Sequence, residues 1–289
     1  MNISKECYLC IYKQVYKIAD KFNLPDKEAS KILREGAKIL SKYDINVTPP
    51  EIAAEEYGKV SEILDVEDLF ENEKKEAIKE ALKFKPMLKL RLLKSPDKLF
   101  DACKIAVAGN VIDLGVHHEY NLEKEIQEIF QMEFKKNDYA EFKTAAEDAD
   151  SICYLADNAG ENVFDELLIE TIKEINPDVK IYYFVRGRPV INDVTIKDLN
   201  IEGLEIFELA EVVDTGVPTP GYHLKFANEK SKKIFFEADM VISKGMGNFE
   251  CLYEECGREV FYLFKVKCDV VGRKAGGEVG DYMLFKGDK

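Results

Sequence analysis

The chain has 289 residues, of which 46% are hydrophobic, so it is long enough to bury a large core. Its formal net charge of −14 at pH 7 repels polyanions, and we expect no nucleic-acid partner. No run approaches the roughly 20 apolar residues of a membrane span, and the start lacks the apolar core of a signal peptide. Seven scattered cysteines favour reduced thiols. We therefore expect a soluble, cytoplasmic protein with no membrane partner.

The first third of the chain has the pattern of helices. From Tyr8 to about Leu93, apolar residues recur at spacings of three and four. Prolines interrupt the pattern at Pro25, at Pro49-Pro50 and at Pro96. We predict an all-helical lobe over residues 1–95 that continues directly into an α/β domain over residues 96–289.

The pattern changes at Asp150. Short apolar runs rich in β-branched and aromatic residues now alternate with helical stretches, which is typical of a parallel sheet. The fold class predicted is α/β, with a doubly wound, mainly parallel sheet of about five to six strands. The predicted strands are Ser151–Ala156, Lys180–Val185, Leu204–Leu209, Met240–Ser243, Val260–Phe264 and, at an edge, Tyr282–Phe285. Helices over Val163–Ile175 and Leu224–Phe236 are expected to connect strands.

Polar residues follow the predicted strands. In open parallel sheets the ligand crevice lies at the carboxyl ends of the strands, so these residues are expected to share one edge. Any one of them also fits an ordinary turn. The segments are Asp157-Asn158-Ala159-Gly160-Glu161, Arg186-Gly187-Arg188-Pro189 with Asn192-Asp193, Asp214-Thr215-Gly216, Lys244-Gly245-Met246-Gly247-Asn248, and Lys265 with Lys267.

Three of these residues offer hard oxygen ligands. Asp157, Asn158 and Asp193 suit Mg²⁺ or Mn²⁺, and they are too few to enclose the ion completely. Such an incomplete shell leaves positions for water or substrate. The sequence thus predicts a catalytic divalent-metal site at this edge.

Cations and glycines stand beside the predicted metal ligands. Arg186 and Lys244 are candidates to hold phosphate oxygens, and Gly245 lets a backbone N–H approach an anion closely. Glu161 fits either this site or the first turn of the following helix.

A second polar pair lies upstream. Asn110 and Asp113 are three residues apart, so on a helix they would share a face. Two interpretations are open: the pair lines the crevice, or it is buried polar packing between the two parts of the chain.

Taken in order, four motifs resemble the series found in the DUF89 damage-control phosphatases. The likeness extends over nearly the whole chain, and the amino-terminal Cys7-Tyr-Leu-Cys10 resembles the CxxC mark of the microbial, archaeal-type subfamily I. The four motifs are Gly109-Asn110-Val-Ile-Asp113, Asp157-Asn158-Ala-Gly-Glu161, Pro189-Val-Ile-Asn192-Asp193 and Lys244-Gly-Met-Gly-Asn248-Phe-Glu250.

The resemblance implies a metal-dependent hydrolase that removes phosphate from damaged or surplus metabolites, such as sugar phosphates or nucleotides. It implies Mn²⁺, Ni²⁺ or Co²⁺ as cofactor, and Mg²⁺ also fits oxygen ligands. Metal ligation carries over to Asp157, Asn158 and Asp193. The phosphate-binding lysine carries over to Lys244, with Asn110 and Asn248 as neighbours. Arg186 departs from the family, where lysine is expected in many relatives.

The mechanism we hypothesise is hydrolysis of a phosphate monoester by metal-activated water. Asp157 and Asp193 are the candidate catalytic carboxylates at the metal. Asp113, which is not a predicted ligand, is the candidate base.

Two other functions are weighed against the phosphatase. A carboxyl methyltransferase using S-adenosylmethionine has been assigned in a eukaryotic branch of the family, but no glycine-rich fingerprint follows the first strand here. A regulator that binds a phosphorylated metabolite without cleaving it would have similar residues. Cys7 and Cys10 fit structural packing better than a metal site, which usually needs four ligands. The substrate, the physiological metal and the oligomeric state do not follow from the sequence.

Overall fold

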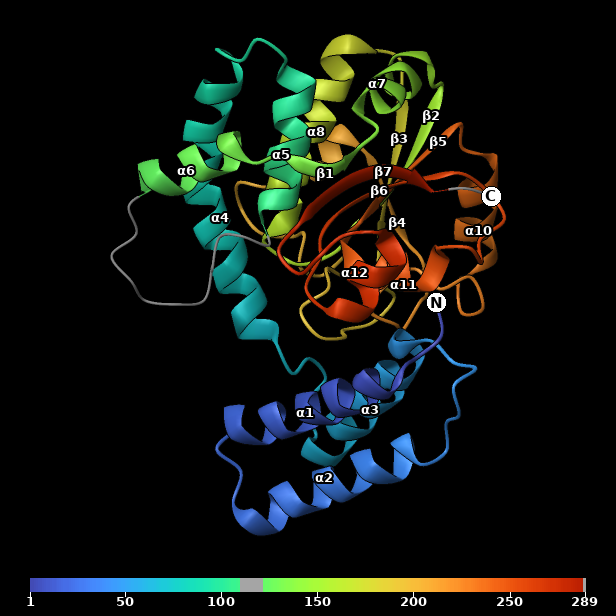
Figure 1. The fold of residues 1–289 in the computed structure, drawn as a ribbon. Helices are drawn as coiled ribbons and strands as arrows, with labels where there is room; N and C mark the ends of the chain where they lie inside the picture. The colour runs from blue at the N-terminus through green and yellow to red at the C-terminus, as the bar shows by residue number, and fades with distance from the viewer. Residues whose placement is uncertain (110–121, 288–289) are drawn as a thin grey trace.

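The computed structural model describes residues 1–109 and 122–287. Three helices form its amino-terminal end, α1 (Lys5–Lys21), α2 (Asp26–Leu40) and α3 (Pro49–Leu64), and they lie together below the sheet in Figure 1. Helix α3 begins at Thr48, whose side chain accepts from the N–H of Glu51 while the carboxylate of Glu51 accepts from the N–H of Thr48. The three helices share apolar contacts of their own, through buried residues such as Val15, Ile32 and Val60.

Helix α4 (Glu71–Leu92) connects this end to the rest of the molecule (Figure 1). Its buried residues Ile78 and Leu88 join the largest apolar cluster, which also includes α5 (Lys98–Ala108) and α8 (Glu161–Ile175). The last of the four amino-terminal helices therefore packs on the α/β part. The division at residues 95 and 96 stays a prediction.

A seven-stranded sheet forms the centre of the α/β part. Its strands run parallel to their neighbours except for the antiparallel pair β6 and β7. In spatial order they are β1 (Phe134–Asn137), β7 (Tyr282–Gly287), β6 (Val260–Lys265), β5 (Met240–Lys244), β2 (Ser151–Leu155), β3 (Lys180–Val185) and β4 (Glu211–Asp214).

Helices cover both faces of the sheet. The side chains of β2 alternate, so Ile152 and Tyr154 enter one apolar cluster while Cys153 and Leu155 enter the other. The first cluster includes α4, α5, α7 (Tyr139–Asp148) and α8, and the second includes α10 (Glu229–Glu237), α11 (Gly245–Leu252) and α12 (Asp269–Ala275). The remaining helices are α6 (Leu122–Gln131) and α9 (Ile206–Leu209). The predicted doubly wound α/β fold with helices at its amino-terminal end is confirmed.

Three details of the predicted sheet are wrong. Leu204–Leu209 is not a strand, because α9 occupies Ile206–Leu209 and the strand, β4, follows it at Glu211–Asp214. The last strand is not at the edge, since β7 lies between β6 and β1. Strand β1 was missed because Phe134-Lys135-Lys136-Asn137 contains only one apolar residue.

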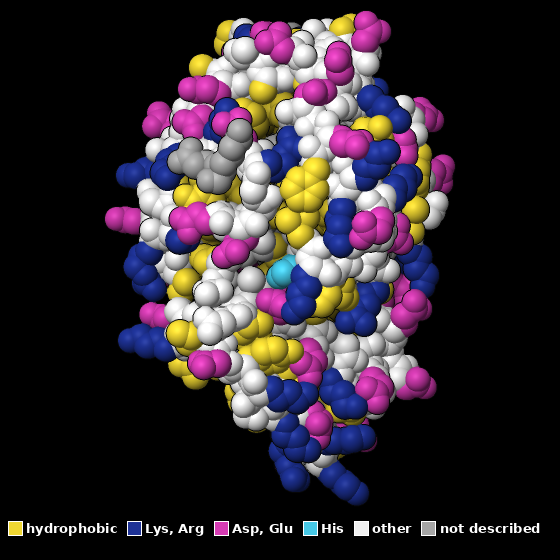
Figure 2. All heavy atoms as spheres, turned by 90° about the vertical axis from the view of Figure 1, so that its right-hand side faces the viewer, with side chains coloured by type: hydrophobic (Ala, Val, Ile, Leu, Met, Phe, Trp, Pro, Cys, Tyr) yellow, Lys and Arg dark blue, Asp and Glu magenta, His cyan; other side chains and the backbone are white. Residues whose placement is uncertain are grey.

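Charges of both signs cover the surface. On the face in Figure 2, Lys and Arg side chains lie among Asp and Glu side chains, so opposite charges offset one another locally. Within residues 1–109 and 122–287, no helix is long and apolar enough to cross a membrane.

Candidate active site at the carboxyl edge of the sheet

The polar residues predicted at the strand ends gather at one edge of the sheet. Strand β2 lies between β5 and β3, and all three run parallel, so their carboxyl ends open on the same side. Asp157 and Asn158 follow β2, Arg186 follows β3, and Lys244 ends β5. Three of the four, Asp157, Arg186 and Lys244, are buried. The edge therefore holds buried charges of both signs.

The segment after β3 folds back and brings Asp193 beside Asn158. The N–H of Val194 donates to the carbonyl of Asp157 at 2.9 Å, and Asn158 and Asp193 form an isolated antiparallel bridge. Ile191 has a φ of 47°, a conformation that is strained for a β-branched residue. Such strain persists only where neighbouring contacts enforce it. The backbone pairing that carries Asp193 is therefore held firmly in place.

Arg186 lies fully inside this edge. Its Nε donates to Oδ2 of Asp193 at 2.6 Å, and its backbone N–H donates to the carbonyl of Val194 at 3.0 Å. Both terminal nitrogens, Nη1 and Nη2, are buried and have no hydrogen-bond partner among the described residues. Leaving buried donors unpaired is unfavourable, and a guanidinium presents them as a fork that matches an oxyanion. The side chain is thus oriented by Asp193, and its two terminal nitrogens are left without a partner in the part of the chain that the structure describes.

Lys244 is equally buried, and carboxylates surround it. Its Nζ lies 2.6 Å from Oδ1 of Asp165 and 3.3 Å from Oε2 of Glu161. Burial lowers the pKa of Lys244, but the negative charges of Asp165 and Glu161 outweigh it, so the net shift is upward. Lys244 is therefore a charged ammonium group.

The two aspartates are held in an unfavourable electrostatic environment. Burial raises the pKa of Asp157, and the charge of Asp193 raises it further, while Lys267, Arg186 and Lys244 oppose the shift. Burial also raises the pKa of Asp193, against the lowering effect of Arg186. Nearby positive charge stabilises both carboxylates in their ionised forms.

Asn158 is oriented by its amide nitrogen. Its Nδ2 donates to Oδ2 of Asp157 at 3.0 Å and to Oε1 of Glu161 at 2.9 Å. Both hydrogens of the amide are thus directed at carboxylates, and the amide oxygen is left as an acceptor. Glu161, which fitted two interpretations, contacts Asn158 and Lys244 and so belongs to this site.

Helix α11 closes the edge from the side of β5. Asn248 is fully buried, and its Nδ2 donates to the carbonyls of Ala156 and Lys244 at 2.9 and 2.6 Å. Its Oδ1 accepts from the N–H of Tyr222 at 2.6 Å. Asn248 therefore braces the ends of β2 and β5, and its predicted contact with phosphate stays a prediction.

The upstream pair lies outside the described residues, so the roles predicted for Asn110 and Asp113 stay predictions. Their neighbour Gly109 is described: a β-carbon there would lie 2.4 Å from Cγ of Glu161. The chain thus approaches the site closely at residue 109.

The two cysteines of the CxxC motif lie on α1. Cys7 is buried and Cys10 is exposed, and neither forms a disulfide. The N–H of Ser4 contacts Sγ of Cys7 at 3.4 Å, so Cys7 takes part in the start of α1. Among the described residues, no group of three or more His, Cys, Asp or Glu side chains is arranged to hold a metal ion. The role of the motif stays a prediction.

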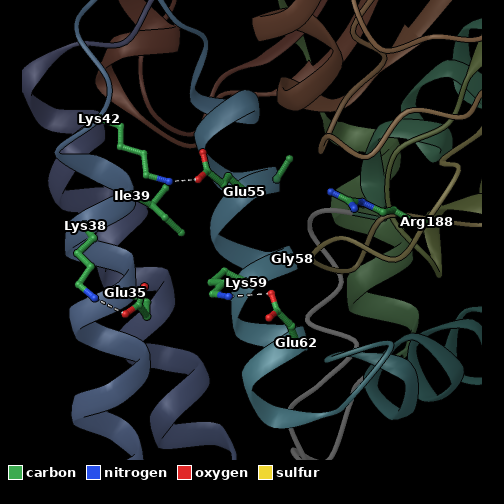
Figure 3. A pocket seen from close by; sticks show the side chains of 10 residues that line it. Glu35, Lys38, Ile39, Lys42, Glu55, Gly58, Lys59, Glu62 and Arg188 are labelled. Carbon is green, nitrogen blue, oxygen red and sulfur yellow. Dashed lines mark hydrogen bonds and ion pairs between the residues drawn. The ribbon is translucent and has the colours of Figure 1, made fainter.

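A separate pocket lies over α2 and α3, beside the loop that follows β3. Figure 3 shows that Arg188 reaches it from the loop that also contains Arg186. The pocket has a volume of about 410 Å³, and its lysines pair with glutamates, for example Lys59 with Glu62 at 2.8 Å. Arg188 is therefore directed at the helices, whereas Arg186 is buried at the sheet edge.

Three residues that support Lys244 from below were missed from the sequence. Asp165 is fully buried beneath Lys244, and the hydroxyls of Tyr154 and Tyr183 donate to it at 2.6 and 2.8 Å. One signal was present: Asp165 stands four residues after Glu161, so the two share a helix face. Tyr154 and Tyr183 gave no signal, because aromatic residues are ordinary in buried strands.

The fold and the site define a class: a doubly wound α/β protein with buried carboxylates, an arginine and a lysine at the carboxyl edge of its sheet. A sequence model of the family described as damage-control phosphatase ARMT1-like domain matches residues 3–283. The chain belongs to this family, and the family membership predicted from the motifs is confirmed.

Known proteins similar to the chain match it over nearly their full length. A protein named damage-control phosphatase from Pyrococcus horikoshii is 33% identical over 95% of this chain and 94% of its own. Another of that name, from Archaeoglobus fulgidus, is 31% identical over 97% of this chain and 98% of its own. The crystal structure of a DUF89 family protein from P. horikoshii is 30% identical, covers 100% of both chains and has a TM-score of 0.91.

Proposed function

We propose that the protein is a metal-dependent phosphatase that hydrolyses phosphate monoesters of small metabolites. One observation carries the proposal: the two terminal nitrogens of Arg186 are buried beside a set of hard oxygen ligands and have no hydrogen-bond partner within residues 1–109 and 122–287. The names of the relatives from P. horikoshii and A. fulgidus support the phosphatase part of the proposal.

The residues at the edge fit a divalent cation. Asp157, Asn158 and Asp193 offer carboxylate and amide oxygens, the ligand type that Mg²⁺ and Mn²⁺ prefer. Ni²⁺ and Co²⁺ also accept such oxygen ligands. Burial and mutual repulsion disfavour the ionised aspartates, so positive charge beside them is favourable. When bound, such an ion supplies Lewis-acid charge and makes water a better nucleophile at neutral pH. We propose Mn²⁺ or Ni²⁺, with Co²⁺ or Mg²⁺ as substitutes.

The cationic side chains bind the phosphate in this proposal. Arg186 donates from its free fork, and Asp193 fixes the direction of that fork through Nε. Lys244 adds an ammonium group that stays charged because of its carboxylate neighbours. Fixed donors of this kind stabilise the charge of a phosphoryl group most strongly in the transition state.

The proposal extends to the setting of the enzyme. All seven cysteines are free thiols, which suits a reducing cytoplasmic compartment. We place the reaction in the α/β part, residues 96–289, with residues 1–95 as an adjoining helical lobe.

Hydrolysis of p-nitrophenyl phosphate with Mn²⁺, Ni²⁺, Co²⁺ or Mg²⁺ tests the proposal. We expect turnover with at least one ion, loss with a chelator, and recovery when the ion is restored. Asp193→Ala should lower kcat by about 100-fold or more. Asp239→Ala is the matched control. The carboxylate of Asp239 accepts from the N–H of Ser151 at the opposite edge of the sheet, where β2 begins.

Two results would reject the phosphatase and indicate another function. Binding of inorganic phosphate without turnover on any metabolite phosphate would indicate a regulator. Binding of S-adenosylmethionine in calorimetry, with no phosphatase activity, would indicate a methyltransferase.

A further inference from the structure

Beneath Lys244 lies a closed cluster of polar side chains that no sequence motif predicted. Asp165 on α8 is at its centre and has no exposed surface. Its Oδ1 accepts from Nζ of Lys244 and from the hydroxyl of Tyr154, both at 2.6 Å, and its Oδ2 accepts from the hydroxyl of Tyr183 at 2.8 Å. Both carboxylate oxygens are therefore hydrogen-bonded.

The two tyrosines are rigid partners. Their rings stack with centroids 5.4 Å apart on the neighbouring strands β2 and β3. Burial, together with the charge of Asp165, raises the pKa of Tyr154 and of Tyr183 well above its usual range, so both keep their protons and donate them. The position of Asp165 is thus fixed by the sheet itself.

This arrangement limits what Lys244 can do. An ammonium group has three N–H donors. In Lys244 one is directed at Asp165 and one at Glu161, which leaves a single donor for another group. The carboxylates thereby fix both the charge of the amine and the direction of its remaining N–H.

The cluster is continuous with the predicted metal ligands. From Lys244 the contacts pass through Glu161 to the amide nitrogen of Asn158, at 3.3 and 2.9 Å, and from there to Asp157 at 3.0 Å. The lysine and the oxygen ligands are therefore held at a set separation by one line of hydrogen bonds.

We propose that Asp165 is a positioning residue for phosphate binding: braced by Tyr154 and Tyr183, it directs the free N–H of Lys244 at a phosphate oxygen. The inference rests on the proposed function, because it assigns phosphate to that site. Asp165 itself lies too deep to touch substrate, so it acts through Lys244. A buried ion pair that only stabilises the fold is the competing interpretation.

A binding experiment separates the two interpretations. Inorganic phosphate is titrated by calorimetry, with Mn²⁺ present, into wild type, Asp165→Asn and Tyr183→Phe, and unfolding in urea is followed in parallel. We expect Asp165→Asn to weaken phosphate binding by about 10- to 100-fold, as loss of a residue that orients a ligand does. Tyr183→Phe keeps the aromatic ring and removes only the hydrogen bond to Oδ2 of Asp165, while Oδ1, which accepts from Lys244, is unchanged. Its effect on phosphate binding should therefore be smaller and in the same direction.

The neighbouring residue supplies the control. Glu166 is also fully buried on α8. Its carboxylate lies 2.6 Å from Nζ of Lys85, and this ion pair is separate from the site. Glu166→Gln should lower the urea midpoint and leave phosphate affinity unchanged. If Asp165→Asn behaves in the same way, Asp165 is structural and the inference is wrong.

A double-mutant cycle gives the second test. If Asp165 acts through Lys244, then Asp165→Asn should change phosphate affinity by no more than about twofold in a Lys244→Met background. Independent effects of the two substitutions would overturn the inference. Because binding is measured, the cycle remains informative if the wild type binds phosphate without hydrolysing it, a result that would reject only the proposed activity.

Discussion

The backbone of Gly245 lies against the carboxylate of Asp157: a β-carbon at residue 245 would be 1.9 Å from Oδ2. Gly245 also has a φ of +76°, which L residues with side chains rarely adopt. The end of β5 and the end of β2 thus meet at a contact that only glycine permits. The position of Asp157, a predicted metal ligand, depends on it.

Gly245→Ala should therefore displace Asp157 and lower phosphatase activity by about 100-fold. Gly257→Ala is a matched control, because Gly257 has a similar φ of +69° but nothing within 4 Å of its would-be β-carbon. It should lose only about 1 to 2 kcal/mol of stability through backbone strain. Equal activities of the two variants, after correction for the folded fraction, would show that the contact with Asp157 is unimportant.

Arg186→Lys tests whether the forked geometry is used. Lysine keeps the charge but loses Nε, which holds Asp193, and offers no bidentate donors. We expect phosphate affinity to fall by about tenfold, measured by calorimetry with Mn²⁺. Arg188→Lys, at the exposed arginine two residues later, should have no effect. Unchanged affinity in Arg186→Lys would mean that charge alone is sufficient.

Lys74 ties α4 to the segment that carries Asp193. Its side chain is fully buried and pairs with Asp68 at 2.5 Å and with Asp198 at 2.7 Å. Oδ2 of Asp198 also accepts from the N–H and the hydroxyl of Thr195, at 2.8 and 2.7 Å. Removing the lysine leaves two carboxylates without their cation.

Lys74→Met should therefore lower the free energy of unfolding by about 3 to 5 kcal/mol, measured in urea. The control is Lys75→Met, at the next residue, which removes an exposed ion pair with Glu71. It should change the free energy of unfolding by at most about 0.5 kcal/mol. A small loss in Lys74→Met would indicate that water reaches this cluster in solution.

Glu56 predicts a pH dependence of stability that is independent of the site. It is 1% exposed, and neither carboxylate oxygen has a hydrogen-bond partner among the described residues. Burial, helped by the nearby charge of Glu55, raises the pKa of Glu56 to about 8. Between the ordinary carboxyl range and pH 8 the folded protein therefore binds a proton that the unfolded chain has lost. Stability from this residue is present below about pH 4.5 and is lost as the pH rises to 8.

Glu56→Gln removes that dependence. The variant should match the wild type near pH 5 and exceed it at pH 8 by on the order of 3 kcal/mol in free energy of unfolding. Urea denaturation at both pH values measures the difference. A constant difference between the two proteins would contradict the raised pKa.

The sequence predicted which polar residues meet at one edge of the sheet more accurately than it predicted the strands. Asp157, Arg186 and Lys244 stand directly after apolar runs, and parallel strands bring such positions together whatever the loops do. By contrast, Leu204–Leu209 has an apolar pattern short enough to fit either a strand or a helical turn. In the folded chain, packing of Ile206 on the core favours the helical turn α9.

The support beneath the site was not predictable from pattern. Asp165 stands between Phe164 and Glu166 in α8. Its burial becomes visible only when β2, β3 and β5 place Tyr154, Tyr183 and Lys244 around it. Likewise, the orientation of the Arg186 guanidinium follows from the return of Asp193 to the end of β3, which the spacing of the two residues does not encode. Motifs locate the candidate site residues, whereas the orientation of their side chains is a property of the folded chain.

In the proposed function, Asp157, Asn158 and Asp193 hold one divalent cation beside the guanidinium of Arg186. Anomalous diffraction at the manganese edge, from crystals soaked with Mn²⁺ and phosphate, tests it most directly. We expect one strong peak within coordination distance of oxygens from all three residues, with phosphate between the peak and the guanidinium. A map without such a peak at saturating Mn²⁺, or with the ion bound elsewhere, would show that these residues do not form the metal site.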